Sequence, residues 1–176
     1  MFQASVVEAN ASPAVFAKYP NAYFVETGNS YGDGIRMALN AGFKNIYSIE
    51  LGPHLYKHCR QRFHSQPSVH LVLGDSAEML SSILQQINSA ATFWLDGHYS
   101  CGCEDTKGKT NTPLLEELEA IKKHSIKTHT ILIDDVRCLR TSQLDFITVS
   151  IICKKILEIN PKYTFAMKMG WSIKIF

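Results

Sequence analysis

The chain has 176 residues, of which 45% are hydrophobic and 19% are charged, and its formal net charge is +2 at pH 7. These values are ordinary for a soluble globular protein, and they fit a single domain over residues 1–176 with one substantial core. A dedicated nucleic-acid binder would concentrate its basic residues on one face. Because the basic residues are scattered along this chain, we expect no nucleic-acid partner.

The sequence also indicates no membrane partner. No apolar stretch approaches the roughly 20 residues that a membrane-spanning helix needs. The N-terminus has no basic leader followed by a long apolar segment, so it is not expected to be a secretory signal. The five cysteines show no disulfide-framework spacing, which indicates reduced thiols and a cytoplasmic location.

Short apolar runs alternate with segments of helical periodicity along most of the chain. The strands are expected at residues 23–25, 45–50, 68–73, 91–96 and 130–134, and the helices at 35–41, 53–63, 77–88 and 113–124. The first 20 residues are expected to cap one side of the sheet, with Ser12 and Pro13 at the start of a short helix. This alternation predicts a doubly wound, Rossmann-like parallel sheet.

The C-terminal part of the chain departs from the alternation. A helix is expected from residue 142 to residue 159, followed by strands at 163–168 and 171–176. Only Met169 and Gly170 separate these two strands, and parallel strands cannot be joined so tightly. The pair is therefore predicted to be an antiparallel hairpin that completes a seven-stranded α/β sheet.

A glycine-rich turn follows the first strand, with the spacing Glu26-x-Gly28-x-x-x-Gly32-x-Gly34. Glycine permits positive φ and lets a ligand approach the main chain closely. The spacing differs from the dinucleotide fingerprint G-x-G-x-x-G. It resembles motif I of the class I S-adenosylmethionine (SAM)-dependent methyltransferases, in a form common in small-molecule O-methyltransferases, although Ser30 stands where many members have a third glycine. A turn without any cofactor role is the alternative.

Each of the first five strands ends on an acid or just before one. The acids are Glu26, Glu50, Asp75, Asp96 and the pair Asp134–Asp135. Because the carboxyl ends of parallel strands lie along one edge of a sheet, these side chains are expected to gather there. Crowded carboxylates repel one another and need hydroxyls, amines or a cation to compensate them. Each acid alone could instead be a turn former or a cap.

The methyltransferase resemblance implies SAM as the cofactor and gives the acids separate roles. Glu50 would accept hydrogen bonds from the two ribose hydroxyls, Asp75 with Ser76 would meet the adenine amino group, and Glu26 with the glycine turn would face the amino-acid tail. The expected cofactor-binding residues are Glu26, Thr27, Gly28, Asn29, Ser30, Gly32, Glu50, Leu51, Asp75, Ser76 and Asp96.

A second group of acids offers hard oxygen ligands. Asp96, Asp134 and Asp135 could hold Mg²⁺ or a similar divalent metal, which would lower the pKa of a bound substrate hydroxyl. His98 could then take the proton as general base, so His98 and Asp96 are the expected catalytic residues. The pattern over about residues 22–136 resembles the metal-dependent O-methyltransferases, including those that act on antibiotic sugars. A helix cap at the aspartate pair and a hydrogen-bonded loop histidine are the competing interpretations.

Residues 97–111 are polar, contain glycine and lack a period, so they are interpreted either as a lid over the acceptor or as an exposed loop. Cys101 and Cys103 in this loop are expected to be free thiols, because Cys-x-Cys is tighter than the usual zinc spacing. Arg137 and Arg140 would neutralise the acid pair or grip an anionic substrate.

Together these features favour a SAM-dependent methyltransferase that transfers a methyl group to a hydroxyl of a small molecule, such as a sugar or another polyhydroxylated acceptor. Two alternatives stay open: a metal-independent methyltransferase with His98 as the base, and a non-catalytic module that binds SAM or a nucleotide. The Asp-Gly-His sequence at residues 96–98 is not the Asn/Asp-Pro-Pro-Tyr/Phe motif of nucleic-acid methylation. Assembly as a homo-oligomer is also left open.

Overall fold

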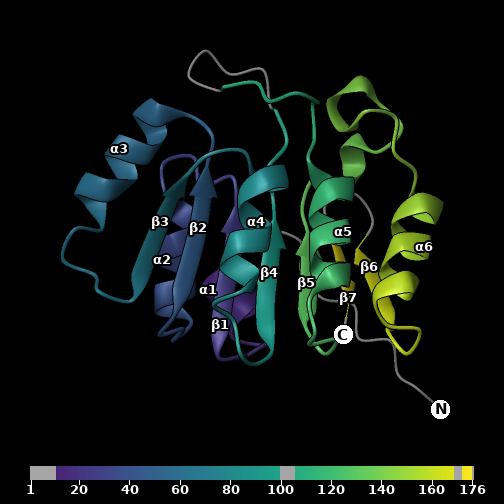
Figure 1. Ribbon diagram of the computed structural model, residues 1–176, viewed down its shortest axis with the longest axis horizontal. Helices are drawn as coiled ribbons and strands as arrows, with labels where there is room; N and C mark the ends of the chain where they lie inside the picture. The colour runs from purple at the N-terminus through teal and green to yellow at the C-terminus, as the bar shows by residue number, and fades with distance from the viewer. Residues whose placement is uncertain (1–10, 100–105, 169–171, 176) are drawn as a thin grey trace.

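The computed structural model describes residues 11–99, 106–168 and 172–175, which form an α/β domain with helices on both faces of one sheet (Figure 1). The strands are β1 (Tyr23–Thr27), β2 (Ile46–Glu50), β3 (Val69–Leu73), β4 (Ala91–Leu95), β5 (Thr130–Ile133), β6 (Phe165–Lys168) and β7 (Ser172–Ile175). The helices are α1 (Pro13–Phe16), α2 (Asp33–Asn40), α3 (Pro53–Arg62), α4 (Ser76–Leu84), α5 (Leu114–Lys123) and α6 (Val149–Ile159), with short 3₁₀ turns at Val136–Cys138 and Ser142–Leu144.

The strands of the described chain lie in the order β3-β2-β1-β4-β5-β7-β6. The first five are parallel, whereas β7 pairs antiparallel with both β5 and β6. The residues that join β6 to β7, at 169–171, lie outside the described part. The order reverses between β1 and β4, and ligands of open α/β sheets bind at such a switch point. The predicted alternation and the parallel α/β sheet are confirmed.

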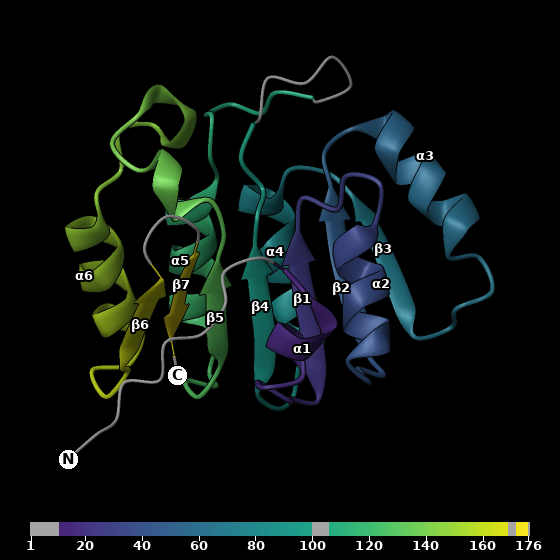
Figure 2. The same cartoon turned by 180° about the vertical axis from the view of Figure 1, so that it is seen from behind.

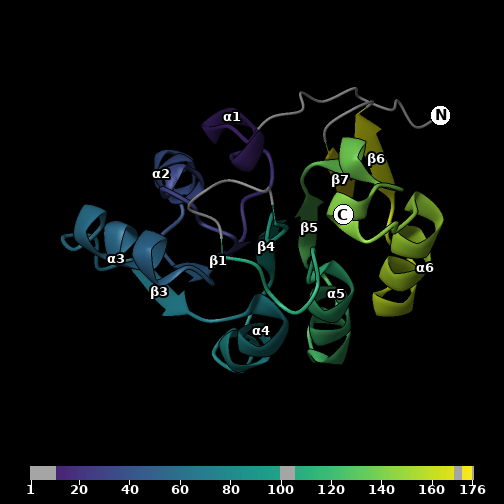
Figure 3. The same cartoon turned by 90° about the horizontal axis from the view of Figure 1, so that it is seen from above.

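Two helical layers enclose the sheet. Helices α4, α5 and α6 cover one face, and α1 and α2 cover the other (Figures 2 and 3). Side chains alternate along β1 and β4, so that Phe24 and Trp94 pack toward α1 and α2 while Val25 and Phe93 pack toward α4 and α5. These four side chains are almost fully buried, which explains why both strands are continuous apolar runs.

Two sequence predictions of element boundaries were wrong in ways that affect the site. Strand β1 continues to Thr27, so Glu26 lies inside the strand and not after it. The helix expected over residues 142–159 begins only at Val149, where the Thr148 hydroxyl caps it by accepting a hydrogen bond from the Ile151 amide. Asp145 and Phe146 adopt positive φ angles of 46° and 57°, which an α-helix cannot contain.

Within the described residues, no helix combines the length and the apolar character that crossing a membrane requires. The longest, α6, has 11 residues.

Candidate functional site

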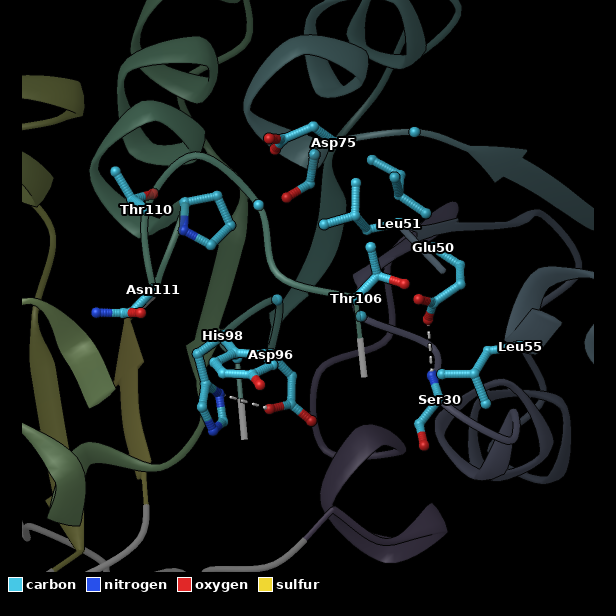
Figure 4. Close-up of a pocket in the computed structure, with 18 of the residues that line it drawn as sticks. Ser30, Glu50, Leu51, Leu55, Asp75, Asp96, His98, Thr106, Thr110 and Asn111 are labelled. Carbon is cyan, nitrogen blue, oxygen red and sulfur yellow. Dashed lines mark hydrogen bonds and ion pairs between the residues drawn. The ribbon is translucent and has the colours of Figure 1, made fainter. Parts of the chain in front are cut away.

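A cavity of about 300 Å³ opens at the carboxyl edge of the parallel strands, at the switch point between β1 and β4 (Figure 4). Seven of the expected cofactor residues line it: Gly28, Ser30, Glu50, Leu51, Asp75, Ser76 and Asp96. His98, Tyr99, Asn111 and Asp135 also line it, as does Thr106, which Figure 4 shows beside Glu50 and Leu51. The structure thus brings together residues from the ends of β1, β2, β3, β4 and β5.

The turn after β1 is held against the end of β4. Gly28 has a φ of +77°, and a Cβ added there would lie 2.4 Å from the carbonyl oxygen of Asp96. Only glycine permits both this backbone conformation and this close approach. The Asp96 amide in turn donates to the Thr27 carbonyl at 3.1 Å, so main-chain contacts hold the ends of β1 and β4 together.

Glu50, the last residue of β2, fixes the same turn from the other side. Its Oε2 accepts hydrogen bonds from the amides of Asn29 and Ser30 at 3.1 and 3.0 Å, and its Oε1 accepts from the Gly52 amide at 2.7 Å. Several backbone donors on one carboxylate stabilise its charged form. Figure 4 shows Glu50 directed toward Ser30 at the edge of the cavity.

The cavity ends at the start of α4, where Asp75 and Ser76 lie. The Asp75 carboxylate caps this helix by accepting a hydrogen bond from the Ala77 amide at 3.0 Å. The Ser76 hydroxyl donates to Oε1 of Glu117 at 2.6 Å. Glu117 comes from α5 and is only 1% exposed.

Sequence reasoning missed Glu117, although a signal for it exists. It lies three residues after Leu114 and four before Ile121, which both belong to the buried face of α5. A charged residue in the apolar stripe of a helix is a buried polar group that needs a partner.

Glu26 does not line the cavity, and its predicted role at the amino-acid tail of SAM is not supported by its position. It is 1% exposed inside β1, where its Oε2 accepts a hydrogen bond from the Ser48 hydroxyl at 2.7 Å. A Cβ on Gly34 would lie 1.7 Å from its Oε1, so the carboxyl group packs against the backbone of α2. Burial raises the pKa of Glu26 to about 8. Thr27, Asn29 and Gly32 also lie outside the lining of the cavity.

Asp96, His98 and Asp135 form a cluster of titratable side chains just after the ends of β4 and β5. His98 Nδ1 lies 3.4 Å from Oδ1 of Asp96, and His98 Nε2 lies 3.2 Å from Oδ2 of Asp135. Burial opposes the charged form of the ring, but hydrogen bonds that the ring donates to both carboxylates prevail and raise the pKa of His98 to about 10. The ring thus bridges two carboxylates, which favour its protonated form.

The expected metal-ligand set changes by one residue. Ligand atoms of Asp96, His98 and Asp135 lie within 4.8 Å of one another, and Asp134 does not belong to this group. Side chains of consecutive residues point in different directions at a strand end, so only one member of the pair can face the cluster. Burial, followed by the charge of Asp96, raises the pKa of Asp134 to about 7.

Arg137 contacts the cluster directly. Its Nη2 lies 2.9 Å from Oδ1 of Asp135, which favours the structural, charge-neutralising interpretation over an anion grip. Arg140 is exposed and has a φ of 65°.

The described parts of the expected lid are tied down at their far end. The Asp145 carboxylate accepts hydrogen bonds from the Asn111 amide at 2.9 Å, from the Asn111 side chain at 2.8 Å and from the Thr112 amide at 3.1 Å. The Tyr99 amide donates to the Asn111 carbonyl at 2.7 Å, which joins the two ends of the loop. Cys101 and Cys103 lie outside the described residues.

No protein-family model matches the chain, and a comparison with curated protein sequences gave no significant match. Solved structures do share its fold. A methyltransferase of Podospora anserina with bound S-adenosylhomocysteine (SAH) is 11% identical, with 88% of this chain and 70% of that chain covered and a TM-score of 0.57.

Two further structures resemble the chain over about half of their own length. An O-methyltransferase family protein from Burkholderia thailandensis is 10% identical, with 92% of this chain and 51% of that chain covered and a TM-score of 0.60. Spermidine synthase from Thermotoga maritima is 12% identical, with 94% and 57% covered and a TM-score of 0.58. At such low identities the likeness establishes only the fold, which these SAM-dependent methyltransferases share. The reaction must be argued from the site.

Proposed function

We propose that the protein is a SAM-dependent methyltransferase that acts on a hydroxyl of a small molecule, with a sugar or another polyhydroxylated compound as the acceptor. The observation that supports this most strongly is the cavity at the switch point, where acids from separate strands line one side and the His98 cluster lines the other. A cofactor on the first side would face a nucleophile on the second. Methyl transfer needs little more than this alignment of nucleophile, methyl carbon and leaving sulfur.

The residues present fit a nucleoside with an amino-acid tail. Glu50 would receive the ribose hydroxyls, and Asp75 with Ser76 would receive the adenine amino group, as their places along the cavity suggest. The Gly28 turn, which lines the cavity, packs against the Asp96 main chain so closely that a side chain there has no room. This cradle of backbone beside carboxylates is what the cofactor requires.

A divalent metal is proposed at Asp96, His98 and Asp135. Two carboxylates and one imidazole suit ions such as Mn²⁺ or Fe²⁺ as well as Mg²⁺. When bound, the ion would lower the pKa of an acceptor hydroxyl. Asp96 and Asp135 lie on either side of His98, so the ring would have to lose a proton and turn one nitrogen from its carboxylate toward the ion.

The alternative without a metal gives His98 the role of general base. The geometry sets a condition on this role, since both ring nitrogens of His98 face carboxylates. The ring could accept a proton only after one of these contacts opens on acceptor binding. Arg137, which holds Asp135 at 2.9 Å, would favour release of the histidine from that side.

The two versions separate in an assay of methyl release from SAM with pooled hydroxylated acceptors. The metal version predicts turnover that is lost in EDTA and restored by added divalent ion, and it predicts loss of activity in Asp135→Asn. Full activity in EDTA would contradict the metal and leave the base mechanism. Binding of SAM with no turnover on any acceptor would instead favour a non-catalytic module.

A further inference from the structure

Glu117 is a buried carboxyl group that neither methyl transfer nor metal binding uses. It lies on α5 with 1% of its surface exposed. The Ser76 hydroxyl donates to its Oε1, and the Thr27 hydroxyl is a second hydrogen-bond partner. Little space is left beside this carboxyl group, because a Cβ added to Gly97 would lie 3.2 Å from Oε1 of Glu117.

Burying a carboxyl group in this way has a cost. Burial, with smaller contributions from the charges of Asp75 and Glu116, outweighs the hydrogen bonds of Ser76 and Thr27 and raises the pKa of Glu117 to about 7. Isolated buried carboxyl groups destabilise a fold unless hydrogen bonds compensate them. A leucine at position 117 would continue the apolar stripe of α5 without this cost, so the carboxyl group needs a reason other than stability.

The reason lies in the direction of the hydrogen bond from Ser76. A serine hydroxyl has one proton and two lone pairs. Since the proton of Ser76 is committed to Glu117, only the lone pairs of Oγ remain for a ligand in the cavity that Ser76 lines. Ser76 therefore acts on the ligand as an acceptor.

Asp75, which precedes Ser76, also offers hydrogen-bond acceptors. Oδ1 of Asp75 accepts a hydrogen bond from the Ala77 amide. Oδ2 of Asp75 lies 3.3 Å from the position that a Cβ on Gly108, another lining residue, would occupy. Asp75 and Ser76 thus both offer acceptors at one end of the cavity, and such a surface favours an amino group over a carbonyl oxygen.

We propose that Glu117 sets the nucleobase specificity of the cavity, because it fixes Ser76 as an acceptor and so selects a 6-aminopurine over a 6-oxopurine. Glu117 is a positioning residue, since it acts through Ser76 and does not touch the base. This inference rests on the proposed cofactor site and adds its selectivity. An oxo group in place of the amino group would face the lone pairs of Ser76 without a proton between them.

The test is calorimetric titration with SAH and with its deaminated 6-oxo analogue, S-inosylhomocysteine. The wild-type protein should bind SAH at least about tenfold more tightly, because the analogue leaves buried acceptors unpaired. In Glu117→Met the Ser76 hydroxyl can rotate and donate to the oxo group, so the preference should fall to about twofold. Glu117→Gln keeps an acceptor oxygen for Ser76 and should retain the preference.

Matched variants give the test its controls. Glu119→Gln changes an acid on the same helix that pairs with Lys122 and Lys155, and it should bind both compounds as the wild type does. Ser76→Ala removes the proposed acceptor directly and should also lower the preference to about twofold, the part that Asp75 still supplies, which keeps a readout of the acceptor if Glu117→Met does not fold. The double variant should lose no more than either single one.

The outcomes separate the two proposals. If the wild type binds SAH but Glu117→Met or Ser76→Ala keeps the full preference, the role of Glu117 is wrong and the cofactor site stands. If the wild type binds both compounds equally, the selectivity itself is refuted. If the wild type binds neither compound, the proposed function fails and this inference fails with it.

Discussion

Gly28 is the residue on which the shape of the cavity depends most directly, because it combines strained backbone with a close contact. We expect Gly28→Ala to lower the free energy of unfolding by about 3 kcal/mol, since the positive φ costs roughly 1–2 kcal/mol and the Cβ would also meet the Asp96 carbonyl at 2.4 Å. Thermal melting measures this loss, and titration with SAH should show that binding is lost.

Gly42→Ala is the matched control for that experiment. Gly42 also has a positive φ, +96°, but no atom lies within 4 Å of the place where its Cβ would be. This variant should carry only the backbone strain, about 1–2 kcal/mol, and should bind SAH normally. Equal melting temperatures for the two variants would show that the contact between Gly28 and Asp96 is not tight.

At the residue scale, the sequence predicted the site in part. Glu50, Asp75, Asp96 and Asp135 line the cavity because each lies at the carboxyl end of a parallel strand or just after it, and that much is visible as a pattern. The pattern could not predict that Glu26 points into the core, because nothing in the sequence marks that the strand continues past Val25 to Thr27. It also could not choose between Asp134 and Asp135, which depends on the φ of 48° at Asp135.

At the scale of elements, a pair of histidines joins α4, α5, β4 and β5 at the edge opposite the cavity. His129 Nδ1 accepts from the Ala91 amide at 3.1 Å, His129 Nε2 lies 2.9 Å from His124 Nδ1, and His124 Nε2 lies 3.2 Å from the Ile87 carbonyl oxygen. This chain of hydrogen bonds is complete only when both rings are neutral. Burial, followed by the proximity of His124, lowers the pKa of His129 to about 4.

The histidine pair should make stability depend on pH in a defined window. An unfolded chain protonates His129 near its ordinary pKa of 6.5, whereas the folded protein resists protonation until about 4. Its stabilisation is therefore complete above about pH 6.5 and declines as the pH falls toward 4, by roughly 2 kcal/mol in all. Urea unfolding across this range should show that His129→Gln lacks this slope.

His54→Gln provides the control for the pH experiment, because His54 is exposed on α3. It should keep the wild-type slope between pH 6.5 and 4. The account of the histidine pair would be wrong if His129→Gln and the wild type lost stability in parallel as the pH falls.

Asp145 connects a second set of elements, since it ties the end of the 97–111 loop to the Ser142–Leu144 turn. Asp145→Asn keeps a residue that tolerates the φ of 46° but loses one of the two oxygens that accept from the Asn111 amide, the Asn111 side chain and the Thr112 amide. We expect trypsin to cleave after Lys107 and Lys109 about fivefold faster in this variant.

Asp33→Asn is the control for the proteolysis, because Asp33 pairs with Arg36 and Arg62 and has no contact with Asn111 among the bonds described. Its cleavage rate after the two lysines should match that of the wild type. An unchanged rate in Asp145→Asn would mean that Asp145 does not hold the loop.

The element pattern itself was the most predictable part of the fold. Strands β4 and β5 are buried on both faces, so their apolar runs left no ambiguity. Residues 142–148 were mistaken for helix because Ile147 falls at helical spacing with Ile151 and continues the apolar stripe of α6. Positive φ at Asp145 and Phe146 depends on tertiary contacts that no periodicity records.

At the scale of the whole molecule, the sheet order is what gives the acids a common place. The chain leaves β1 toward β2 and β3, then crosses back to β4 and β5, so the helices that follow β1 and β4, α2 and α5, lie on opposite faces of the sheet. Glu50, Asp75 and Asp96 come from three different strands and line one cavity for this reason. The fold therefore explains the position of the site, and its side chains must explain the reaction.

The most direct test of this account is calorimetric titration of SAH into the wild-type protein, Glu50→Gln and Glu158→Gln. The account predicts one micromolar site in the wild type and in Glu158→Gln, which changes an exposed acid of α6. It predicts binding at least about tenfold weaker in Glu50→Gln, where an amide replaces the carboxylate that holds the Asn29 and Ser30 amides. No binding of SAH to the wild type at millimolar concentration, or equal binding by Glu50→Gln, would contradict it.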